Sequence, residues 1–450
     1  MHHRLSSSLS RGLSTFGLAL AVLAPSVAAE TIEVPDDFSD LQAALDAASP
    51  GDVIEVSDGP YFGSYSISVP GLTLIGNGTV IDAEFEGPCF VVATSDVTIE
   101  DFELINGTSG VASVSFTDGI ATPGLTVRGC TISNCGPDAG LLIEGDSCTL
   151  VENIITDCSN DGIHYEAINT SSETLIAQNR VSFCTDDGID ARGGGLTISD
   201  NTVDHCEDNG IAVDLEGDED GGGGFSVVVY RNTSNDNGDD GIYVNEVGNA
   251  EGVYISDNTC LRNADDGINF LGEECFIVAN RCDDNLDDGI DVDDSFAVII
   301  RENTVQRNLE NGISADSALT LILENRVKRN HRNGIMASGS ALIADNEVLR
   351  NVRNGIILDD VSLYEEFDDG GPDGGDSAVV GNRIEKNGFQ GISNSATDTA
   401  ITGNICKKNN GKLGPDIAGL GDGSGSVSEF SGNTGTGGSD VEDRLNTAQD

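Results

Sequence analysis

An asparagine followed nine residues later by a Gly-Ile pair recurs ten times between residues 153 and 392, and no other feature constrains the fold as strongly. Successive Gly-Ile pairs are most often 22 residues apart, and the longer steps contain insertions. A fixed period of this size indicates a solenoid. Inside each period apolar residues alternate with a step of two, between Gly, Asn and Asp, which predicts turns of short strands. The pairs are Asn153/Gly162, Asn179/Gly188, Asn201/Gly210, Asn232/Gly241, Asn258/Gly267, Asn280/Gly289, Asn303/Gly312, Asn325/Gly334, Asn346/Gly355 and Asn382/Gly391.

A second marker lies five residues after each leading asparagine and is a cysteine in the early repeats and an asparagine in the later ones. Stacked asparagines can hydrogen-bond to their counterparts in the coils above and below, which satisfies buried amides. We therefore predict an asparagine ladder that continues a cysteine ladder. The second markers are Cys158, Cys184, Cys206, Asn237, Asn263, Asn285, Asn308, Asn330, Asn351, Asn387 and Asn409.

With these markers the chain resembles the right-handed parallel β-helix family, the pectin-lyase-like superfamily, over roughly residues 30 to 420. The resemblance implies an all-β, single-stranded right-handed parallel β-helix solenoid with an N-terminal helix cap. The predicted divisions are a signal peptide (1–29), an N-terminal cap (30–58), the β-helix (59–418) and a tail rich in Gly, Ser and Asp (419–450). This scaffold carries lyases, hydrolases, epimerases, adhesins and metal-maturation proteins, so it does not fix an activity.

The first 29 residues have the pattern of a secretory signal peptide: basic residues, an apolar run from Phe16 to Ala24, and Val27-Ala28-Ala29. We expect cleavage after Ala29 and a secreted or periplasmic protein without membrane insertion. In the cap, Leu41, Ala44, Leu45 and Ala48 share one face of a predicted helix. The candidate helix caps are Asp36, Asp37 and Ser39.

The net charge excludes some classes of partner, and the cysteine count bears on whether disulfides form. The 77 acidic and 22 basic residues give a net charge of −55, which argues against nucleic acid and anionic lipid as partners. The eleven cysteines are odd in number, so at least one is unpaired. Parallel, in-register side chains suit a disulfide poorly, which favours buried free thiols.

Candidate catalytic residues lie on the strand that begins at each Gly-Ile pair, where alternate residues point outward. In the first four regular coils these outward residues form one wall: His164, Glu166, Asp190, Arg192, Asp214, Tyr243 and Asn245. Abstraction of the C5 proton of a uronate needs a cation for the carboxylate, a base and an acid. We assign Arg192 as the clamp, His164 as the base and Tyr243 as the acid. Asp190 and Asp214 would orient these groups or hold calcium, and Glu166 and Asn245 would bind substrate.

The resemblance is partial at this wall. Mannuronan C5-epimerases carry Gly-Phe-Asp-Pro-His on the corresponding strand, and Gly188-Ile189-Asp190-Ala191-Arg192 keeps the Gly and the Asp. Polygalacturonases carry Asn-Thr-Asp-Gly-Ile-Asp, to which residues 185–190 are similar, but the other elements of those hydrolases and the pectate lyase signatures are absent. A structural interpretation competes: Asp187 and its equivalents before each Gly-Ile pair are turn residues that bond the local backbone.

Two further charged groups are candidates for binding. The segment 301–353 is locally basic, and Arg329 and Arg350 fall at one coil position while Arg332 and Arg353 fall at another. This group suits a polyanionic glycan. The alternative interpretation is that the arginines offset neighbouring acids on a solvated face. A stack of acids that includes Asp287, Asp288, Asp291 and Asp293 offers the oxygen ligands that Ca2+ prefers.

The leading hypothesis is an exported enzyme that acts on an acidic polysaccharide by C5 proton abstraction, as a uronate lyase or a C5-epimerase. The alternative is a non-catalytic surface or matrix β-helix protein that binds glycan, calcium or both. A periplasmic metal-maturation protein is a third possibility, disfavoured by only five His and two Met. The concentration of His, Tyr and Arg in coils 162–245 favours the enzyme. The oligomeric state stays open.

Overall fold

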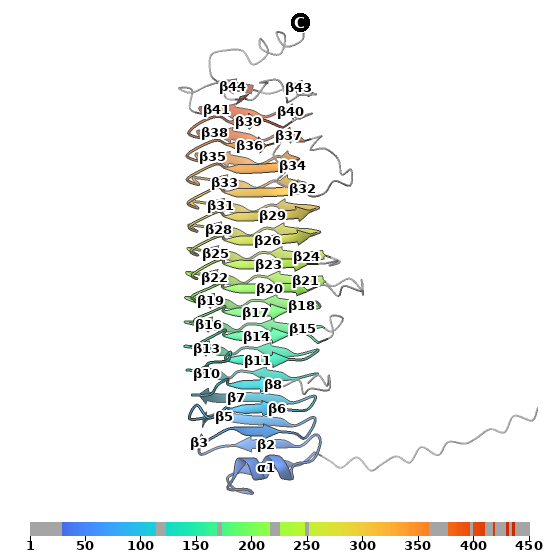
Figure 1. Cartoon of the computed structure of the whole chain (residues 1–450), viewed down its shortest axis with the longest axis vertical. Coiled ribbons are helices and arrows are strands. Elements are labelled where there is room, and N and C mark those ends of the chain that lie inside the picture. The colour runs from blue at the N-terminus through green and yellow to red at the C-terminus, as the bar shows by residue number, and fades with distance from the viewer. Residues whose placement is uncertain are drawn as a thin grey trace, which may run out of the picture.

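Each coil of the chain stacks on the previous one to form a parallel β-solenoid with a single helix at its N-terminal end (Figure 1). The computed structural model describes residues 29–113, 123–168, 173–216, 226–247, 252–359, 377–396, 399–409, 417–418, 429–431 and 434–436. All strand pairings among these residues are parallel, and each strand pairs with its equivalents one coil before and one coil after. The predicted solenoid of short strands is confirmed.

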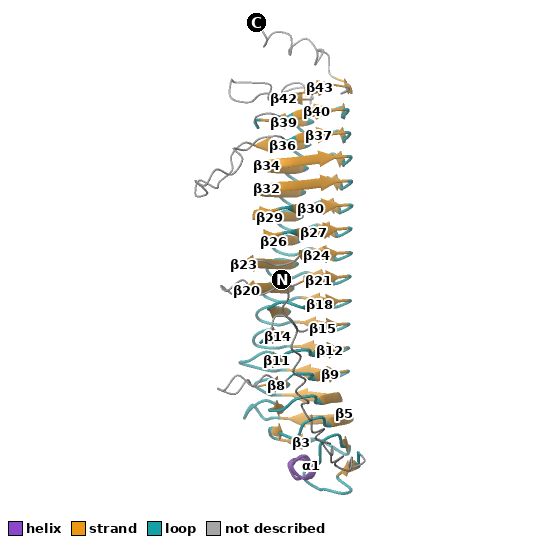
Figure 2. Cartoon of the chain, turned by 90° about the vertical axis from the view of Figure 1, so that its right-hand side faces the viewer, coloured by secondary structure: helices purple, strands orange, loops and turns teal. Residues whose placement is uncertain are grey.

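Three strand columns, which we call the first, second and third faces, run along the solenoid (Figure 1), and Figure 2 shows the second and third of them side by side. The first face holds β10 (Thr131–Ser133), β13 (Ile154–Thr156), β16 (Arg180–Ser182), β19 (Thr202–Asp204), β22 (Thr233–Asn235), β25 (Thr259–Leu261), β28 (Arg281–Asp283), β31 (Thr304–Gln306), β33 (Arg326–Lys328), β35 (Glu347–Leu349), β38 (Arg383–Glu385), β41 (Ile405–Lys407) and β44 (Thr434–Thr436).

The second face follows the Gly-Ile turn and holds β4 (Tyr65–Ile67), β6 (Phe90–Val92), β8 (Val111–Ser113), β11 (Leu141–Glu144), β14 (Ile163–Glu166), β17 (Ile189–Arg192), β20 (Ile211–Glu216), β23 (Ile242–Val247), β26 (Ile268–Glu273), β29 (Ile290–Phe296), β36 (Ile356–Asp359), β39 (Ile392–Asn394) and β42 (Ile417–Ala418). The third face holds β9 (Thr126–Arg128), β12 (Thr149–Val151), β15 (Thr174–Ala177), β18 (Leu196–Ser199), β21 (Ser226–Tyr230), β24 (Gly252–Ser256), β27 (Cys275–Val278), β30 (Val298–Arg301), β37 (Ala378–Val380), β40 (Ala400–Thr402) and β43 (Glu429–Ser431).

Some long strands turn a corner and serve two faces. Both β32 (Ile313–Leu323) and β34 (Ile335–Ala344) run from the second face to the third. The N-terminal coils contain β1 (Thr31–Val34), β2 (Val53–Val56), β3 (Tyr61–Phe62), β5 (Thr73–Asp82) and β7 (Thr98–Ile105). Where the burial of a strand is described, most inward residues are aliphatic and have almost no solvent exposure, as at Ile155, Val181 and Val203. This continuous core is what the alternating pattern predicts.

The asparagine ladders are confirmed. Asn280 donates its backbone N–H and its Nδ2–H to the Oδ1 of Asn303 one coil on, at 2.8 and 3.1 Å, and Nδ2 also donates to the carbonyl of Ile255 at 2.8 Å. The same pattern runs along the leading asparagines, and a second ladder follows the later markers, as between Asn285 and Asn308. Each buried amide is therefore satisfied by the next coil.

All eleven cysteines are free and buried, as predicted. Cys158, Cys184 and Cys206 continue the corner that the second asparagine ladder occupies further along the chain, and each thiol is at most 3% exposed. They pack there as small apolar groups.

Helix α1 (Leu41–Ala47) covers the first coil and buries Leu41, Ala44 and Leu45 against it, which confirms the predicted helix cap (Figure 1). The predicted N-caps are wrong, because the helix begins later. Asp40 is the N-cap, and its Oδ1 accepts a hydrogen bond from the Ala43 N–H at 3.0 Å. Asp37 instead accepts from the backbone N–H of Glu33.

Several predictions fall outside the described residues. These are the signal peptide, most of the C-terminal tail, and the larger part of three insertions that follow second-face strands, which lie within 216–226, 246–251 and 360–377. Within the described part of the chain, no helix has the length and apolar character needed to cross a bilayer.

Candidate functional site

The second face presents two outward columns of polar side chains in its early coils. Strand register places His164 beside Asp190, then Ala212 and Tyr243 in the following coils. The second column holds Glu166, Arg192, Asp214 and Asn245 in consecutive coils. The fixed spacing after each Gly-Ile turn sets this register, so the predicted wall exists.

The centre of this wall is a set of four residues, which we call the His164 cluster: Asp161, His164, Asp190 and Arg192. Asp190 Oδ2 lies 2.8 Å from His164 Nδ1 and 3.1 Å from Arg192 Nη2. Asp161 Oδ2 lies 3.3 Å from the same His164 nitrogen. The Asp161 and Asp190 side chains are only 6% exposed, whereas that of Arg192 is 45% exposed. One buried carboxylate therefore holds both an imidazole and a guanidinium that reach solvent.

Electrostatics separate the protonation states within the cluster. Hydrogen bonding of its Nδ1–H to the carboxylates of Asp161 and then Asp190 raises the pKa of His164 to about 9, against an opposing effect of burial. Burial alone would raise the pKa of Asp190, but the hydrogen bond and charge of His164, with those of Arg192, bring it below its usual value. At neutral pH the cluster is therefore an imidazolium and a guanidinium around ionised Asp190. With Nδ1 facing the carboxylates, Nε2 is the nitrogen left for substrate.

The register does not bring Tyr243 to the cluster. Three coil steps separate it from His164, which is roughly 14 Å along the axis at about 4.8 Å per coil. Burial first, and then the charge of Asp214, raises the pKa of its phenol. Asn245 lies equally far along the neighbouring column. Tyr243 and His164 are therefore too far apart along the axis to contact one sugar ring, which spans about one coil.

Sequence reasoning missed Asp161, which we had grouped with the turn residues. Its Oδ1 does accept a backbone N–H, from Asp187 at 3.2 Å, while its Oδ2 faces His164. Equivalent side chains form a third ladder in which each carboxylate or amide oxygen accepts a hydrogen bond from a backbone N–H one coil on. Asp187 Oδ1, for example, accepts from the N–H of Asn209 at 2.9 Å. The available signal was the His three residues after Asp161, which the other repeats lack.

An acid column runs beside this third ladder. Its backbones hydrogen-bond coil to coil, and its members are Asp186, Asp208, Asp239, Asp265, Asp287 and Glu310. The adjoining ladder positions are largely acidic as well: Asp187, Asn209, Asp240, Asp266, Asp288 and Asn311. Three groups of carboxylates have ligand oxygens within 4.8 Å of one another: Asp186/Asp187/Asp208, Asp239/Asp240/Asp265 and Asp265/Asp266/Asp287. Oxygen ligands drawn from two coils fit the geometry that Ca2+ accepts.

The crowding of these acids shifts their protonation. Burial, followed by the charges of neighbouring aspartates, raises the pKa of Asp239 to about 6. Burial also raises the pKa of Asp240 to about 7, of Asp187 to about 8 and of Asp266 to about 11. These four carboxylates therefore keep their protons up to the raised pKa values unless a cation offsets their charge.

The four residues predicted as metal ligands do not form one group. Asp287 belongs with Asp265 and Asp266. Asp288 is a ladder residue whose Oδ1 accepts the Asn311 N–H. Asp291 and Asp293 lie in the outward columns of β29, and burial raises the pKa of Asp291 to about 8. Neither Asp291 nor Asp293 joins a group of three potential ligands, so the carboxylate groups that could hold a cation among the described residues are formed by turn acids.

Stability without divalent cations is expected to fall as pH rises from about 5 to about 8. The folded chain binds protons at Asp239, Asp240 and Asp187 that an unfolded chain releases near their ordinary pKa of about 4. The stability that these bound protons supply is fully present below a pH of about 4 and is lost as pH rises through about 6 to 8. Calcium should raise the thermal midpoint most at the alkaline end, where the carboxylates are free to bind it.

Circular dichroism melts across this pH range, with chelator and with calcium, check the expectation. Asp265→Asn, which alters two of the three groups, should reduce the calcium increment. Asp257→Asn is the control, because Asp257 is exposed and lies outside the columns. Thermal midpoints that depend on neither pH nor calcium would contradict the cation sites.

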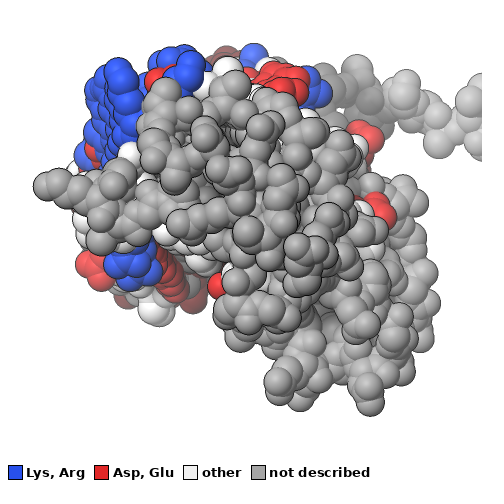
Figure 3. Space-filling model, turned by 90° about the horizontal axis from the view of Figure 1, so that it is seen from above, with Lys and Arg blue, Asp and Glu red and all other residues white. Residues whose placement is uncertain are grey.

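The basic residues lie on later coils. Arg329 and Arg350 stack at the end of the first face, with Lys386 after them, and Figure 3 shows Lys and Arg stacked at one corner of the solenoid. Arg332 and Arg353 continue the acid column, and Arg332 pairs with Glu310. The arginines begin six coils after Asp190, which is roughly 29 Å at about 4.8 Å per coil. Only an extended polymer would touch both places.

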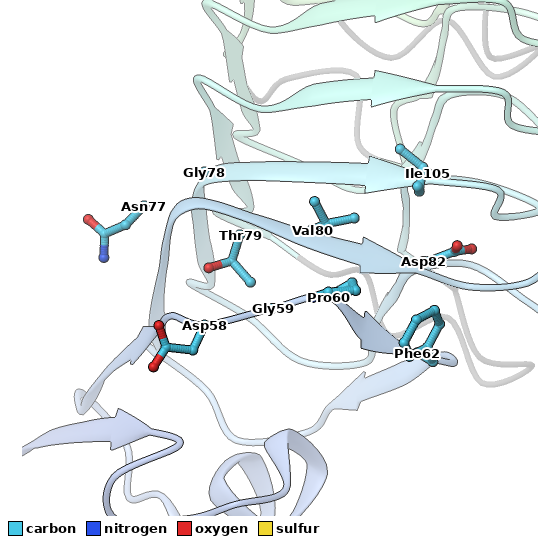
Figure 4. A pocket seen from close by; sticks show the side chains of 10 residues that line it. All are labelled: Asp58, Gly59, Pro60, Phe62, Asn77, Gly78, Thr79, Val80, Asp82 and Ile105. Atoms are coloured by element: carbon cyan, nitrogen blue, oxygen red, sulfur yellow. The ribbon is translucent and has the colours of Figure 1, made fainter.

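One cavity of about 470 Å3 lies elsewhere, in the N-terminal coils (Figure 4). Asp58 and Asn77 lie at one end of it and Phe62 and Asp82 at the other (Figure 4). It contains no histidine, arginine or lysine. The His164 cluster therefore forms on an open face of the solenoid rather than in this cavity.

Comparisons with known proteins agree with the fold. A family model described as the right handed beta helix region matches residues 70–219 and 193–351. A search of curated protein sequences finds no match.

Among solved structures, the A-modules of two mannuronan C-5 epimerases of Azotobacter vinelandii are similar to the chain. The AlgE6 module is 15% identical over 89% of this chain and 95% of its own, with a TM-score of 0.49. The AlgE4 module is 14% identical over 91% and 98%, with a TM-score of 0.42. The catalytic unit of an α-1,3-glucanase of Streptomyces thermodiastaticus is 14% identical over 93% and 71%, with a TM-score of 0.37.

Proposed function

The chain belongs to the right-handed β-helix family, and on that premise we propose that it is an exported enzyme that cleaves an acidic polysaccharide at the His164 cluster by β-elimination. The observation that carries the proposal is the contact of one buried carboxylate, Asp190, with both His164 and Arg192. The repeat does not require this contact, because the same outward position is Ala212 in the next coil and Tyr243 in the one after.

The proposed chemistry uses His164 as the proton carrier. Asp161 and Asp190 hold the ring by Nδ1, so that Nε2 of the neutral imidazole accepts the C5 proton of a uronate. The electron pair of the C5–H bond forms the C4–C5 double bond and the bond to O4 breaks. The imidazolium then returns its proton to O4. Because the ring is neutral only near and above its raised pKa of about 9, the activity is alkaline.

Arg192 is the proposed carboxylate clamp. Its guanidinium is 45% exposed, and the contact with Asp190 leaves other N–H donors free. A cation beside the uronate carboxylate favours loss of the C5 proton, because charge spreads onto the carboxylate as the proton leaves. Glu166 and Asp214 flank Arg192 in the adjacent coils, and their charges favour its protonated form.

A lyase fits the cluster better than an epimerase. Epimerisation needs one group to remove the proton and another to return it on the opposite face, and Tyr243 lies roughly 14 Å away. Elimination needs only the one carrier. A C5-epimerase is the second candidate, favoured by the Gly188–Asp190 match to the epimerase motif.

Calcium would be held by the turn acids beside the cluster, Asp186, Asp187 and Asp208. When bound, the ion supplies positive charge that reduces the repulsion between a polyuronate and a chain of net charge −55. Arg329, Arg332, Arg350 and Arg353 would contact distant residues of the same polymer. Secretion or export to the periplasm follows from the signal-peptide pattern.

The test is incubation of the protein with alginate, pectate and glycosaminoglycans, with calcium and with chelator. The expected result is new absorbance from unsaturated uronate. Proton NMR of the polymer distinguishes an epimerase, which changes the uronate ratio without cleavage and would replace the lyase assignment. No change in either readout would contradict catalysis and favour a surface or matrix protein that binds glycan or calcium.

A further inference from the structure

The third face of the solenoid carries almost no charge. Over the eleven coils from β12 to β40, two outward residues per strand give 22 positions, and among these described residues only Arg301 is charged. The positions are Thr149/Val151, Leu175/Ala177, Thr197/Ser199, Val228/Tyr230, Tyr254/Ser256, Phe276/Val278, Ile299/Arg301, Leu321/Leu323, Leu342/Ala344, Ala378/Val380 and Ala400/Thr402.

Strand propensity does not explain the lack of charge, because the strands of the first face are equally regular and do carry charged outward residues. Its equivalent 22 outward positions, from β13 to β41, include ten charged residues. They are Arg180, Asp204, Arg281, Asp283, Arg326, Lys328, Glu347, Arg383, Glu385 and Lys407. The third face differs by also carrying large apolar side chains such as Phe276, Leu321 and Leu342, which a solvated strand does not need.

Aromatic residues lie at the middle of the third face. The rings of Tyr254 and Phe276 stack in parallel, with centroids 4.9 Å apart and planes 5° apart. Tyr254 is 42% exposed, and these residues belong to the fifth and sixth of the eleven coils. A central aromatic pair with an uncharged surround is the usual composition of an interface centre.

We propose that the third face is a dimer interface and that its partner is the third face of a second copy of this chain. Two copies of net charge −55 repel one another wherever acids face acids. The third face has no acid at its 22 outward positions, so contact there brings fewer acids together than contact through the first face. A two-fold axis near Phe276 places the aromatic pair of one copy against that of the other, with the helix axes antiparallel.

The size of the face suits this partner. Eleven coils at about 4.8 Å and strands of four residues at about 3.3 Å give a projected area of roughly 700 Å2. Stable complexes bury about 800 Å2 of accessible surface per partner, and accessible surface exceeds projected area. The exposed side chains of Phe296 and Leu319 extend the apolar area at the corner with the second face.

Sedimentation velocity of the full chain over a range of concentrations tests the proposal. We expect a reversible dimer that tightens at high NaCl, because salt screens the repulsion between the acidic surfaces. Phe276→Lys should raise the dimer dissociation constant at least about 30-fold. Thr304→Lys places a lysine at an outward position of the first face and should leave the dimer dissociation constant unaltered.

Cross-linking gives a second test that does not depend on the lysine variant folding. Every native cysteine is buried, so Phe276→Cys adds a single accessible thiol. It should form a disulfide-linked dimer under mild oxidation, whereas Thr304→Cys should not. A chain that stays monomeric at all concentrations and salts, or that cross-links equally through both positions, would overturn the proposal. Binding of the monomer to a neutral glycan through this face would overturn it as well.

Discussion

Replacing His164 with glutamine is expected to lower kcat/KM for uronate-polymer cleavage by about 100- to 10,000-fold, the range that a general acid–base group supplies. Glutamine keeps a hydrogen-bonding side chain beside Asp161 and Asp190 but cannot carry the proton. The thermal midpoint at neutral pH should fall as well, because glutamine removes the imidazolium charge that faces two buried carboxylates. The rates are therefore compared well below the melting range of both proteins. Absorbance of unsaturated uronate measures the rate, and circular dichroism confirms the fold.

The chain offers a matched control for this variant. His205 Nδ1 lies 2.8 Å from Asp204 Oδ1, the same distance as between His164 and Asp190, but its side chain is 52% exposed and lies just after a first-face strand. His205→Gln should leave the rate unchanged. Equal losses in the two variants, or none in His164→Gln, would remove the His164 cluster from the mechanism.

Replacing Gly289 with alanine is expected to destabilise the fold by about 3 kcal/mol or more, at the upper end of overpacking effects. A Cβ at this position would lie 2.7 Å from the carbonyl oxygen of Gly312 and closer still to Val305 and to the ladder residue Asn308. Neither the Gly312 backbone nor the Asn308 side chain can move away from the added Cβ, because each is held in place by the next coil. The glycine is therefore needed for the close approach of coils rather than for an unusual φ.

Thermal and denaturant unfolding followed by circular dichroism measures this effect. Gly87→Ala is the control, because the nearest atom to its added Cβ is the Ser64 hydroxyl at 3.3 Å. Neighbouring coils stabilise one another in a solenoid, so the loss should extend beyond one repeat. Equal melting behaviour of Gly289→Ala and Gly87→Ala would contradict the packing account.

Most of the fold could be predicted from the sequence because a solenoid repeats one local arrangement. Once Asn303 and Gly312 are aligned with their equivalents, the inward column, the ladders and the register follow without knowledge of distant contacts. The predicted N-cap of α1 was wrong. Several acids precede the helix, and their backbone φ and ψ angles, which the sequence does not reveal, decide which of them caps it. Asp40 has an extended backbone, with φ −125° and ψ 124°, from which its side chain reaches the N–H of Ala43.

The site was predicted less completely, because it depends on side-chain direction rather than on the repeat. His164, Asp190 and Arg192 are brought together as expected. Asp161 was missed because its turn role is real, and only the second oxygen of its carboxylate serves the cluster. Tyr243 shares the wall, yet counting coils shows that it lies beyond the reach of a single sugar.

The pH dependence of kcat/KM for the wild type and Asp190→Asn tests the central claim most directly. In the wild type the rate should rise with pH toward about 9, because the base is His164 and its neighbouring carboxylates raise its pKa. Asparagine removes one of those charges, so the rising limb should move down toward the ordinary histidine pKa of about 6.5. A wild-type limb near about 6.5, or the same limb in both proteins, would contradict catalysis by a histidine that Asp190 holds.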